Sequence, residues 1–143
     1  MKRRYGFTVD TDLTFEAAES RVRELLKEEG FGVLTEIDIK QTLKDKLDVD
    51  FRPYRILGAC NPALSHRALQ VEPGIGLLLP CNVVVEGGPA GGSRISFLDP
   101  EIALGLVGNP ELEPIAKDAS QRLRRVADRL SGAASFADIA SSN

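Results

Sequence analysis

The sequence predicts an α+β fold in which a mostly antiparallel, five-stranded sheet carries two long helices on one face, with short helices inserted between the strands. Segments with apolar residues at every second position alternate with segments in which they recur every three or four positions. A glycine-rich stretch, "GGPAGG" at 87–92, joins two strand segments directly, as in an antiparallel hairpin. Two long amphipathic segments, 15–29 and 111–130, supply the helical layer.

The first strand and the first helix are predicted from the N-terminal 30 residues. Tyr5, Phe7 and Val9 alternate along "RYGFTV", which indicates a strand with one buried face. Thr14 is a suitable N-cap and Gly30 a suitable stop for the helix that follows. One stripe of that helix carries its apolar residues, which are Phe15, Ala18, Val22, Leu25 and Leu26.

The middle of the chain alternates strands with short helices. Strands are predicted for "FGVLTEID" at 31–38 and "FRPYRILGA" at 51–59, and a helix for 39–47, where apolar residues are four apart. Asn61 and Pro62 then begin a short helix that ends before Pro73 and Gly74, because Asn accepts from free backbone donors and Pro is tolerated at the first helical position.

The third part of the chain closes the sheet. The run "GLLLPCNVVVE" lacks polar alternation, which predicts a central strand at 77–85 that is covered on both faces. After the hairpin, "SRISFLD" gives the last strand. The final helix, 111–130, has one apolar face made of Ile115, Ala119, Leu123, Val126 and Leu130. We therefore expect one domain at 1–131, followed by a flexible tail at 132–143.

Composition limits the classes of partner. The 143 residues are 43% hydrophobic and 27% charged, which is typical of a globular protein with a single core. A net charge of −3 gives no field that would hold a phosphate backbone, so we expect neither nucleic acid nor a membrane as the main partner. No apolar run reaches the roughly 18 residues of a transmembrane helix, and the N-terminus lacks the apolar core of a signal peptide. We expect a cytoplasmic protein, and with two cysteines in a reducing compartment no structural disulfide.

Three segments resemble a known family. They are "KEEGFGVLTEIDIKQTLKDKL", "FRPYRILGACNPALSHRAL" and "GIGLLLPCNVVV". Together they are similar to the bacterial and archaeal domain-of-unknown-function family 302, over nearly the whole chain up to the tail. The resemblance implies a TATA-binding-protein-like β-α-β4-α arrangement and a homodimer, and it implies no established activity. The positions that carry it are Cys60, Asn61 and Pro62 in one segment and Pro80, Cys81 and Asn82 in another.

Cys60, Asn61, Cys81 and Asn82 form the predicted ligand-binding site. Cys60 comes just before a helix start, where free N–H groups and the helix dipole favour a thiolate. If the strand ends bring Cys60, Cys81 and the single histidine, His66, together, they offer two sulfurs and one nitrogen. Ligands of this kind suit zinc, copper or a haem iron.

The same residues also fit a purely structural role or an enzymatic one. Free cysteines are often simply buried, and about 200° of helical rotation separates His66 from the apolar Leu64, which places the imidazole toward solvent. No CxxC or HxxxH pair is present, and the 21-residue spacing of the cysteines matches no named metal motif. A Cys–His nucleophile oriented by Asn61 or Asn82 is the enzymatic alternative. Nothing in the sequence selects an acid–base pair from Glu86, Asp99 and Glu101.

Three classes of function therefore remain. The first is a homodimeric binding module that holds a small ligand or a soft metal at Cys60 and Cys81. The second is an enzyme that uses Cys60 as a redox or nucleophilic thiol. The third is a structural or interaction protein in which both thiols are inert.

Overall fold

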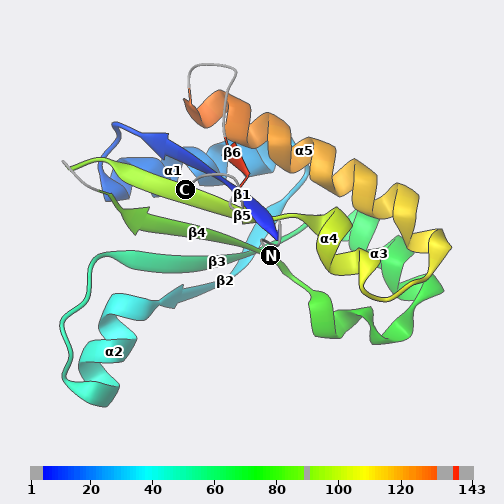
Figure 1. Ribbon diagram of the computed structural model, residues 1–143, viewed down its shortest axis with the longest axis horizontal. Helices are drawn as coiled ribbons and strands as arrows, with labels where there is room; N and C mark the ends of the chain where they lie inside the picture. Colours follow the sequence, from blue (N-terminus) through cyan, green and yellow to red (C-terminus); the bar gives the residue numbers. More distant parts are fainter. Residues whose placement is uncertain (1–4, 89–90, 132–136, 139–143) are drawn as a thin grey trace.

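One antiparallel sheet organises the molecule (Figure 1). The computed structural model describes residues 5–88, 91–131 and 137–138. The strands have the spatial order β2-β3-β4-β5-β1-β6, and every neighbouring pair is antiparallel. The strands are β1 (Gly6–Thr11), β2 (Gly32–Asp38), β3 (Tyr54–Cys60), β4 (Cys81–Gly87), β5 (Ser93–Leu98) and β6 (Ala137–Asp138).

Five α-helices and two 3₁₀ helices are inserted between or after the strands of the described chain. The helices are α1 (Phe15–Glu28), α2 (Ile39–Leu47), α3 (Pro62–Val71), η1 (Pro73–Leu78), α4 (Pro100–Gly105), η3 (Pro110–Leu112) and α5 (Glu113–Ser131). Without the short insertions, the order is a strand, a helix, four strands and a helix, as the resemblance implied. The predicted α+β class and the five-stranded antiparallel sheet, β1 to β5, are confirmed. The tail predicted at 132–143 lies outside the described residues except for β6, which pairs with β1.

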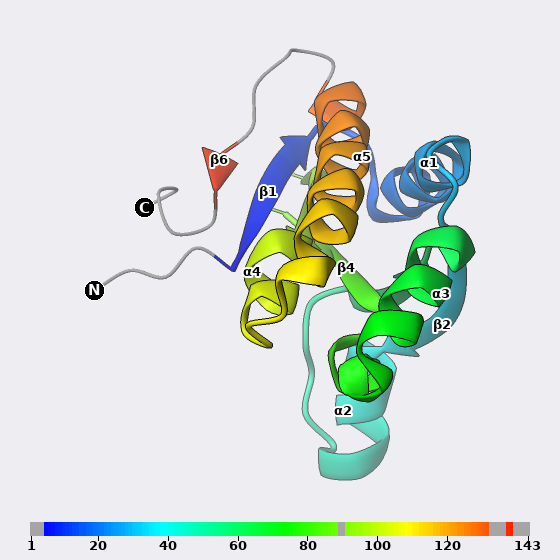
Figure 2. The ribbon, with the colours of Figure 1, turned by 90° about the vertical axis from the view of Figure 1, so that its right-hand side faces the viewer.

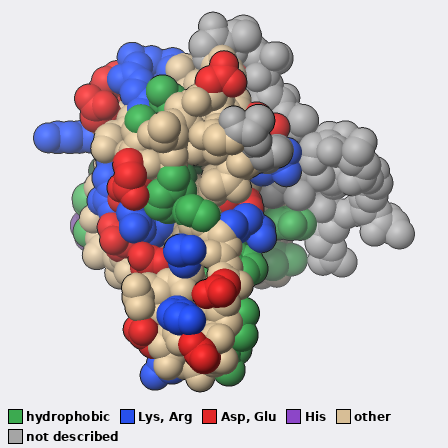
Figure 3. Space-filling model, turned by 90° about the vertical axis from the view of Figure 1, so that its left-hand side faces the viewer, with side chains coloured by type: hydrophobic (Ala, Val, Ile, Leu, Met, Phe, Trp, Pro, Cys, Tyr) green, Lys and Arg blue, Asp and Glu red, His purple; other side chains and the backbone are tan. Residues whose placement is uncertain are grey.

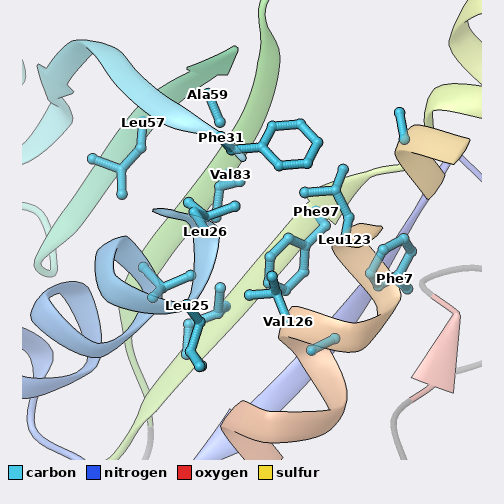
Figure 4. Close-up of a cluster of buried hydrophobic side chains, with 14 of the residues drawn as sticks. Phe7, Leu25, Leu26, Phe31, Leu57, Ala59, Val83, Phe97, Leu123 and Val126 are labelled. Atoms are coloured by element: carbon cyan, nitrogen blue, oxygen red, sulfur yellow. The ribbon is translucent and has the colours of Figure 1, made fainter. Parts of the chain in front are cut away.

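The helices α1 and α5 cover one face of the sheet (Figure 2). Alternate residues of β1, β3, β4 and β5 point into the core between the sheet and these two helices, where Phe7 and Phe97 stack with ring centroids 5.2 Å apart. Figure 4 shows how aliphatic side chains of α1 and α5 pack around them. The buried hydrophobic side chains of these strands are Phe7, Val9, Leu57, Ala59, Val83, Val85, Ile95 and Phe97.

The two long helices match their predicted stripes. Thr14 caps α1 by accepting from the backbone N–H of Ala17, and Gly30, with a φ of 86°, takes the left-handed conformation after its end. In α5, all five residues of the predicted stripe are buried. The helix begins at Glu113, because 110–112 form the 3₁₀ turn η3.

The other face of the sheet has no helical layer among the described residues, and this corrects the prediction for 77–85. Leu78 ends the 3₁₀ helix η1, and β4 begins only at Cys81. Along β4, Val83 and Val85 are buried, whereas Val84 is half-buried and Asn82 is exposed. The unbroken apolar run therefore does not mean burial on both faces. It combines a 3₁₀ turn with a strand that is covered on one side.

Helix α2 projects from the edge of the sheet between β2 and β3 (Figure 1). Its bounds are those predicted, and Asp38 caps it through the backbone N–H of Gln41. None of its residues is buried, although its apolar residues lie on one stripe. We call residues 32–50, which comprise β2, α2 and the turn after α2, the β2–α2 arm.

Candidate functional site

The ends of β3 and β4 meet the start of α3, and the two cysteines lie at this junction. Ala59 of β3 is the register partner of Cys81, and Cys60 is the next residue of β3. Asn61 then caps α3. Both strand ends belong to one hydrogen-bonded pair, so the backbones of the two cysteines lie side by side. Strand alternation alone would turn the Cys60 side chain away from that of Cys81. Cys60 is however the last residue of β3, and its thiol contacts Ser65, which lines the same small cavity as Cys81.

Cys60 is half-buried at the last position of β3. Its Sγ lies 3.2 Å from Oγ of Ser65, a residue in the second turn of α3. Ser65 was not among the predicted site residues, although its place four residues after the N-cap Asn61 puts it on the side of α3 that faces back toward the strand end. A hydroxyl at this distance donates to a thiolate or accepts from a thiol.

Cys81 is the more enclosed of the two thiols. Burial raises the pKa of Cys81 to about 11 from an ordinary value of 9.0, and the neighbouring Cys60 raises it further in the same direction. Its side chain packs against the hydrophobic core. At neutral pH, Cys81 is therefore a protonated thiol.

Asn61 is buried and uses both ends of its amide. Its Oδ1 accepts from the backbone N–H of Leu64 at 3.2 Å, which is the N-cap interaction predicted from the sequence. Its Nδ2 donates to the backbone carbonyl of Glu29, at the end of α1, at 3.4 Å. This pair of contacts fixes the start of α3, and with it Cys60, relative to α1.

A small apolar cavity lies beneath α3 beside Cys81. Its volume is about 30 Å³, and its walls include Ala59, Ser65 and Cys81. This volume is that of a single water molecule, whereas sites for organic ligands measure about 300–1,000 Å³. The cavity has room for an atom or a small ion next to the Cys81 thiol, and the porphyrin of a haem does not fit.

His66 and Asn82 do not join the two cysteines. His66 is exposed on α3, as its helical spacing indicated. Asn82 follows Cys81 in β4 and therefore points to the opposite, uncovered face of the sheet. Among the described residues, no group of three or more His, Cys, Asp or Glu side chains could hold a metal ion. The predicted three-ligand set of Cys60, Cys81 and His66 is thus not assembled, because the imidazole lies on the outer side of its helix.

Glu86, Asp99 and Glu101, the acidic residues considered as an acid–base pair, do not form one. Two of them have structural partners. Asp99 is buried, caps α4 through the backbone N–H of Glu101, and accepts from Ser120 and from Nη2 of Arg124. Glu86 pairs with Arg52 on the open face of the sheet. Asp99 therefore has a structural role, since it ties α4 to α5.

Charges of both signs are intermixed on the surface. On the face in Figure 3, acidic and basic side chains lie next to each other with hydrophobic side chains between them. The arginines of α5 that form a stripe in the sequence are paired: Arg122 with Asp118, Arg125 with Glu29 and Arg129 with Glu28. None of the helices in the described chain is long and apolar enough to cross a lipid bilayer.

The fold and the junction define a class of small α+β proteins in which two neighbouring thiols lie where an antiparallel sheet meets a short helix. The family model described as "Domain of unknown function DUF302" matches residues 7–130, so the chain belongs to this family. A solved structure, the crystal structure of an uncharacterized conserved protein DUF302 from Bacillus stearothermophilus, is 34% identical in sequence. The match covers 90% of this chain and 99% of that chain, with a TM-score of 0.82. No curated protein matches the sequence significantly.

Proposed function

We propose that the protein is a homodimeric binding module whose Cys60 and Cys81 hold a soft metal ion, and that the ion is copper(I). The proposal depends on one observation above all: two cysteines lie side by side at the ends of paired strands, with no third potential ligand grouped with them in the described chain. Two thiolates suffice for copper(I), which soft sulfur ligands select.

The other two candidate groups, zinc and haem, need more than this site offers. Zinc takes at least three protein ligands in catalytic sites and four in structural sites, and the described residues group only two here. Haem needs an axial ligand facing a cavity of a few hundred Å³, and the cavity beside Cys81 has only about 30 Å³. Copper(I) is therefore favoured over both.

The surroundings of the thiols support an anionic site. Both thiols lose their protons when they bind a cation, so a copper(I) ion with two thiolates carries one net negative charge. The N-terminal end of α3, which begins directly after Cys60 and Asn61, favours negative charge. The Ser65 hydroxyl lies within 3.2 Å of Cys60 Sγ and is able to donate to its thiolate.

Anaerobic titration with copper(I) against a coloured competing chelator tests the proposal. We expect the reduced protein to take one copper ion per chain, and Cys60→Ser and Cys81→Ser each to lose that binding. His66→Ala is the matched control, since His66 is exposed on the same helix away from the thiols, and it should bind as the wild type does. Unchanged binding in either serine variant, or no binding in the wild type, contradicts the proposal.

The homodimer is supported by apolar side chains that remain exposed on the β2–α2 arm. Leu34 is 70% exposed and Leu47 is 66% exposed, while Ile37 and Val49 lie nearby on the same arm. An exposed apolar patch of this kind is covered when the same patch of a second copy packs against it, as in a two-fold dimer.

Light scattering measures the assembly directly. We expect the wild type to have twice the 15.5 kDa mass of the chain at micromolar concentration. Replacing both Leu34 and Leu47 by Glu should give the mass of a single chain with an unchanged circular dichroism spectrum. A wild-type mass of one chain refutes the dimer. A double variant that remains dimeric would mean that the interface lies outside the β2–α2 arm.

Thiol chemistry at Cys60 is the second candidate function. The different surroundings of the two cysteines favour it, since Cys81 packs against the hydrophobic core and Cys60 lies beside the Ser65 hydroxyl. A Cys60 thiolate attacks a hydroperoxide to give a sulfenic acid and release hydroxide or alkoxide. The Cys81 thiol then displaces water from it to form a disulfide. Peroxide treatment followed by non-reducing peptide mapping should yield a Cys60–Cys81 disulfide, and Cys81→Ser should stop at a trappable sulfenic acid. If neither cysteine is oxidised, only the inert, structural role remains for them.

A further inference from the structure

A larger cavity lies where the chain turns from α4 into α5, and it shares Leu104 with the small cavity beside Cys81. Its volume is about 430 Å³, and it is enclosed by the end of α4, the turn at 106–109, η3 and the first turns of α5. This volume lies within the usual range of small-molecule sites. Neither cysteine lines it, so an inference about it is independent of the copper proposal.

The floor of this cavity is apolar. Leu104 of α4, Leu112 of η3 and Ala116 of α5 line it, and all three are buried in the folded chain. Because these three side chains offer no hydrogen-bond partner, the part of a ligand that reaches them must be apolar, and aliphatic walls suit an aliphatic group. Such a body would bury apolar surface without leaving an unpaired polar group.

The rim of the cavity carries both signs of charge. Glu101 of α4 and Glu113 of α5 line it together with Lys117 of α5. All three are exposed, and within the residues that the structure describes none of them takes part in a side-chain hydrogen bond or an ion pair. Two carboxylates suit an ammonium group, and the ammonium of Lys117 suits a carboxylate.

The wall opposite α5 is held in place before any ligand arrives. Asn109 accepts from the backbone N–H of Glu111 and donates through Nδ2 to the carbonyl of Val71 and to Glu72 Oε1, each at 3.0–3.1 Å. Asp99 caps the start of α4 and bonds to Ser120 of α5 at 3.2 Å, which fixes the other wall. A cavity with fixed walls costs little ordering on binding.

We propose that this cavity binds a small zwitterion with an aliphatic body, which is the chemistry of a free aliphatic amino acid. The ammonium group lies between Glu101 and Glu113, the carboxylate lies at Lys117, and the aliphatic side chain rests on Leu104 and Leu112. Because the rim presents carboxylates and an ammonium together, a ligand that carries both charges meets a partner for each. No covalent step is involved.

Four matched probes separate the parts of this ligand: L-leucine, 3-methylbutylamine, which lacks the carboxylate, 4-methylpentanoate, which lacks the amine, and glycine, which lacks the body. Backbone amide NMR shifts report binding and its location in the full chain. We expect leucine to bind most tightly, with shifts concentrated in 101–117. If the amine or the acid alone binds as tightly as leucine, the ligand need not be a zwitterion and the proposal is wrong. If leucine shows no saturable binding, the cavity is not a site for it.

Variants that change the charge or fill the volume of the cavity provide a second test. Glu113→Gln should weaken leucine and the amine by about tenfold and leave the acid unchanged, whereas Lys117→Gln should weaken leucine and the acid. Gly105 lines the cavity, and a Cβ added there meets no atom within 4 Å, so the backbone accepts a side chain and Gly105→Leu should fill part of the cavity. Gly76→Leu, at an equally open position outside the cavity, is its control. Leucine binding that survives Gly105→Leu overturns the proposal.

Discussion

Asn61 and Glu29 join the start of α3 to the end of α1. The Asn61 Nδ2 donates to the Glu29 carbonyl at 3.4 Å, and Nη1 of Arg122 donates to the same carbonyl at 3.0 Å. The Glu29 carboxylate in turn accepts from Arg125 of α5. Three helices therefore meet at one residue, and the position of Cys60, which directly precedes Asn61, depends on this contact.

Replacement of Asn61 by Ala should lower the free energy of unfolding by about 2 kcal/mol, because the cap of α3 and a hydrogen bond to a buried amide are both lost. Urea denaturation measures the loss. Asn61→Ser keeps an oxygen for the cap and removes the donor to Glu29, so its loss should be clearly smaller. Equal losses in the two variants would mean that the Glu29 contact, and not the cap, dominates.

The raised pKa of Cys81 predicts a loss of stability at alkaline pH. The unfolded chain releases this proton near the ordinary value of 9.0 and the folded chain only near 11, so the stabilisation is complete below 9.0 and is lost as the pH rises toward 11. A rise in the Cys81 pKa from 9.0 to about 11 corresponds to about 2 to 3 kcal/mol in the free energy of unfolding.

A comparison of wild type with Cys81→Ala isolates this effect, because Tyr54, whose pKa is also raised by burial, titrates in both proteins. We expect the difference in unfolding free energy between the two proteins to shrink over this alkaline range. A difference that is independent of pH would mean that the folded Cys81 thiol titrates as a solvent-exposed thiol does.

The two thiols should react at different rates at neutral pH. Cys60 is half-buried and precedes the start of α3, whereas the pKa of Cys81 is raised to about 11. In single Cys→Ser variants, iodoacetamide should therefore label Cys60 faster than Cys81. Equal, slow labelling of both residues, together with no bound metal, would assign the cysteines to core packing alone.

The fold was predictable where apolar periodicity is long. The stripes of α1 and α5 extend over more than three turns, so a single face emerges from the pattern. Helix α4 was missed because its six residues are too few for a periodic signal, although Asp99 and Pro100 are a helix-start pair. The run at 77–79 was misassigned because apolar character alone does not distinguish a strand from a 3₁₀ turn, in which Leu77 points into solvent.

The candidate site was predictable only in part. Strand order brings Cys60 and Cys81 together, and helical spacing indicated that His66 lies outside. The alternation of side chains along β4 could have excluded Asn82, which is adjacent to Cys81 and so faces the other way. The cavity between α4 and α5 has no local sequence signal, since it arises from how two helices and a turn pack against one another.

Gly58 lies in β3 where the strands leave no room for a side chain. A Cβ there would lie 2.1 Å from Oγ1 of Thr35 and 2.8 Å from Cγ of Pro80. The Thr35 hydroxyl is able to rotate away, but the Pro80 ring is not. Gly58→Ala should therefore lower the free energy of unfolding by about 1 to 2 kcal/mol. Gly32→Ala in the neighbouring strand, where a Cβ meets no atom within 4 Å, is the control and should change it by less than about 0.5 kcal/mol.

Because Pro80 directly precedes Cys81, the same substitution should also disturb the thiol site. We expect Gly58→Ala to label faster than wild type at Cys81, since a displaced Pro80 exposes the buried thiol. Adding Thr35→Ala removes one of the two clashes, so the double variant should lose less stability than the sum of the single losses. Additive losses and an unchanged labelling rate would mean that β3 absorbs the extra methyl group by moving away from both neighbours, leaving Cys81 where it is.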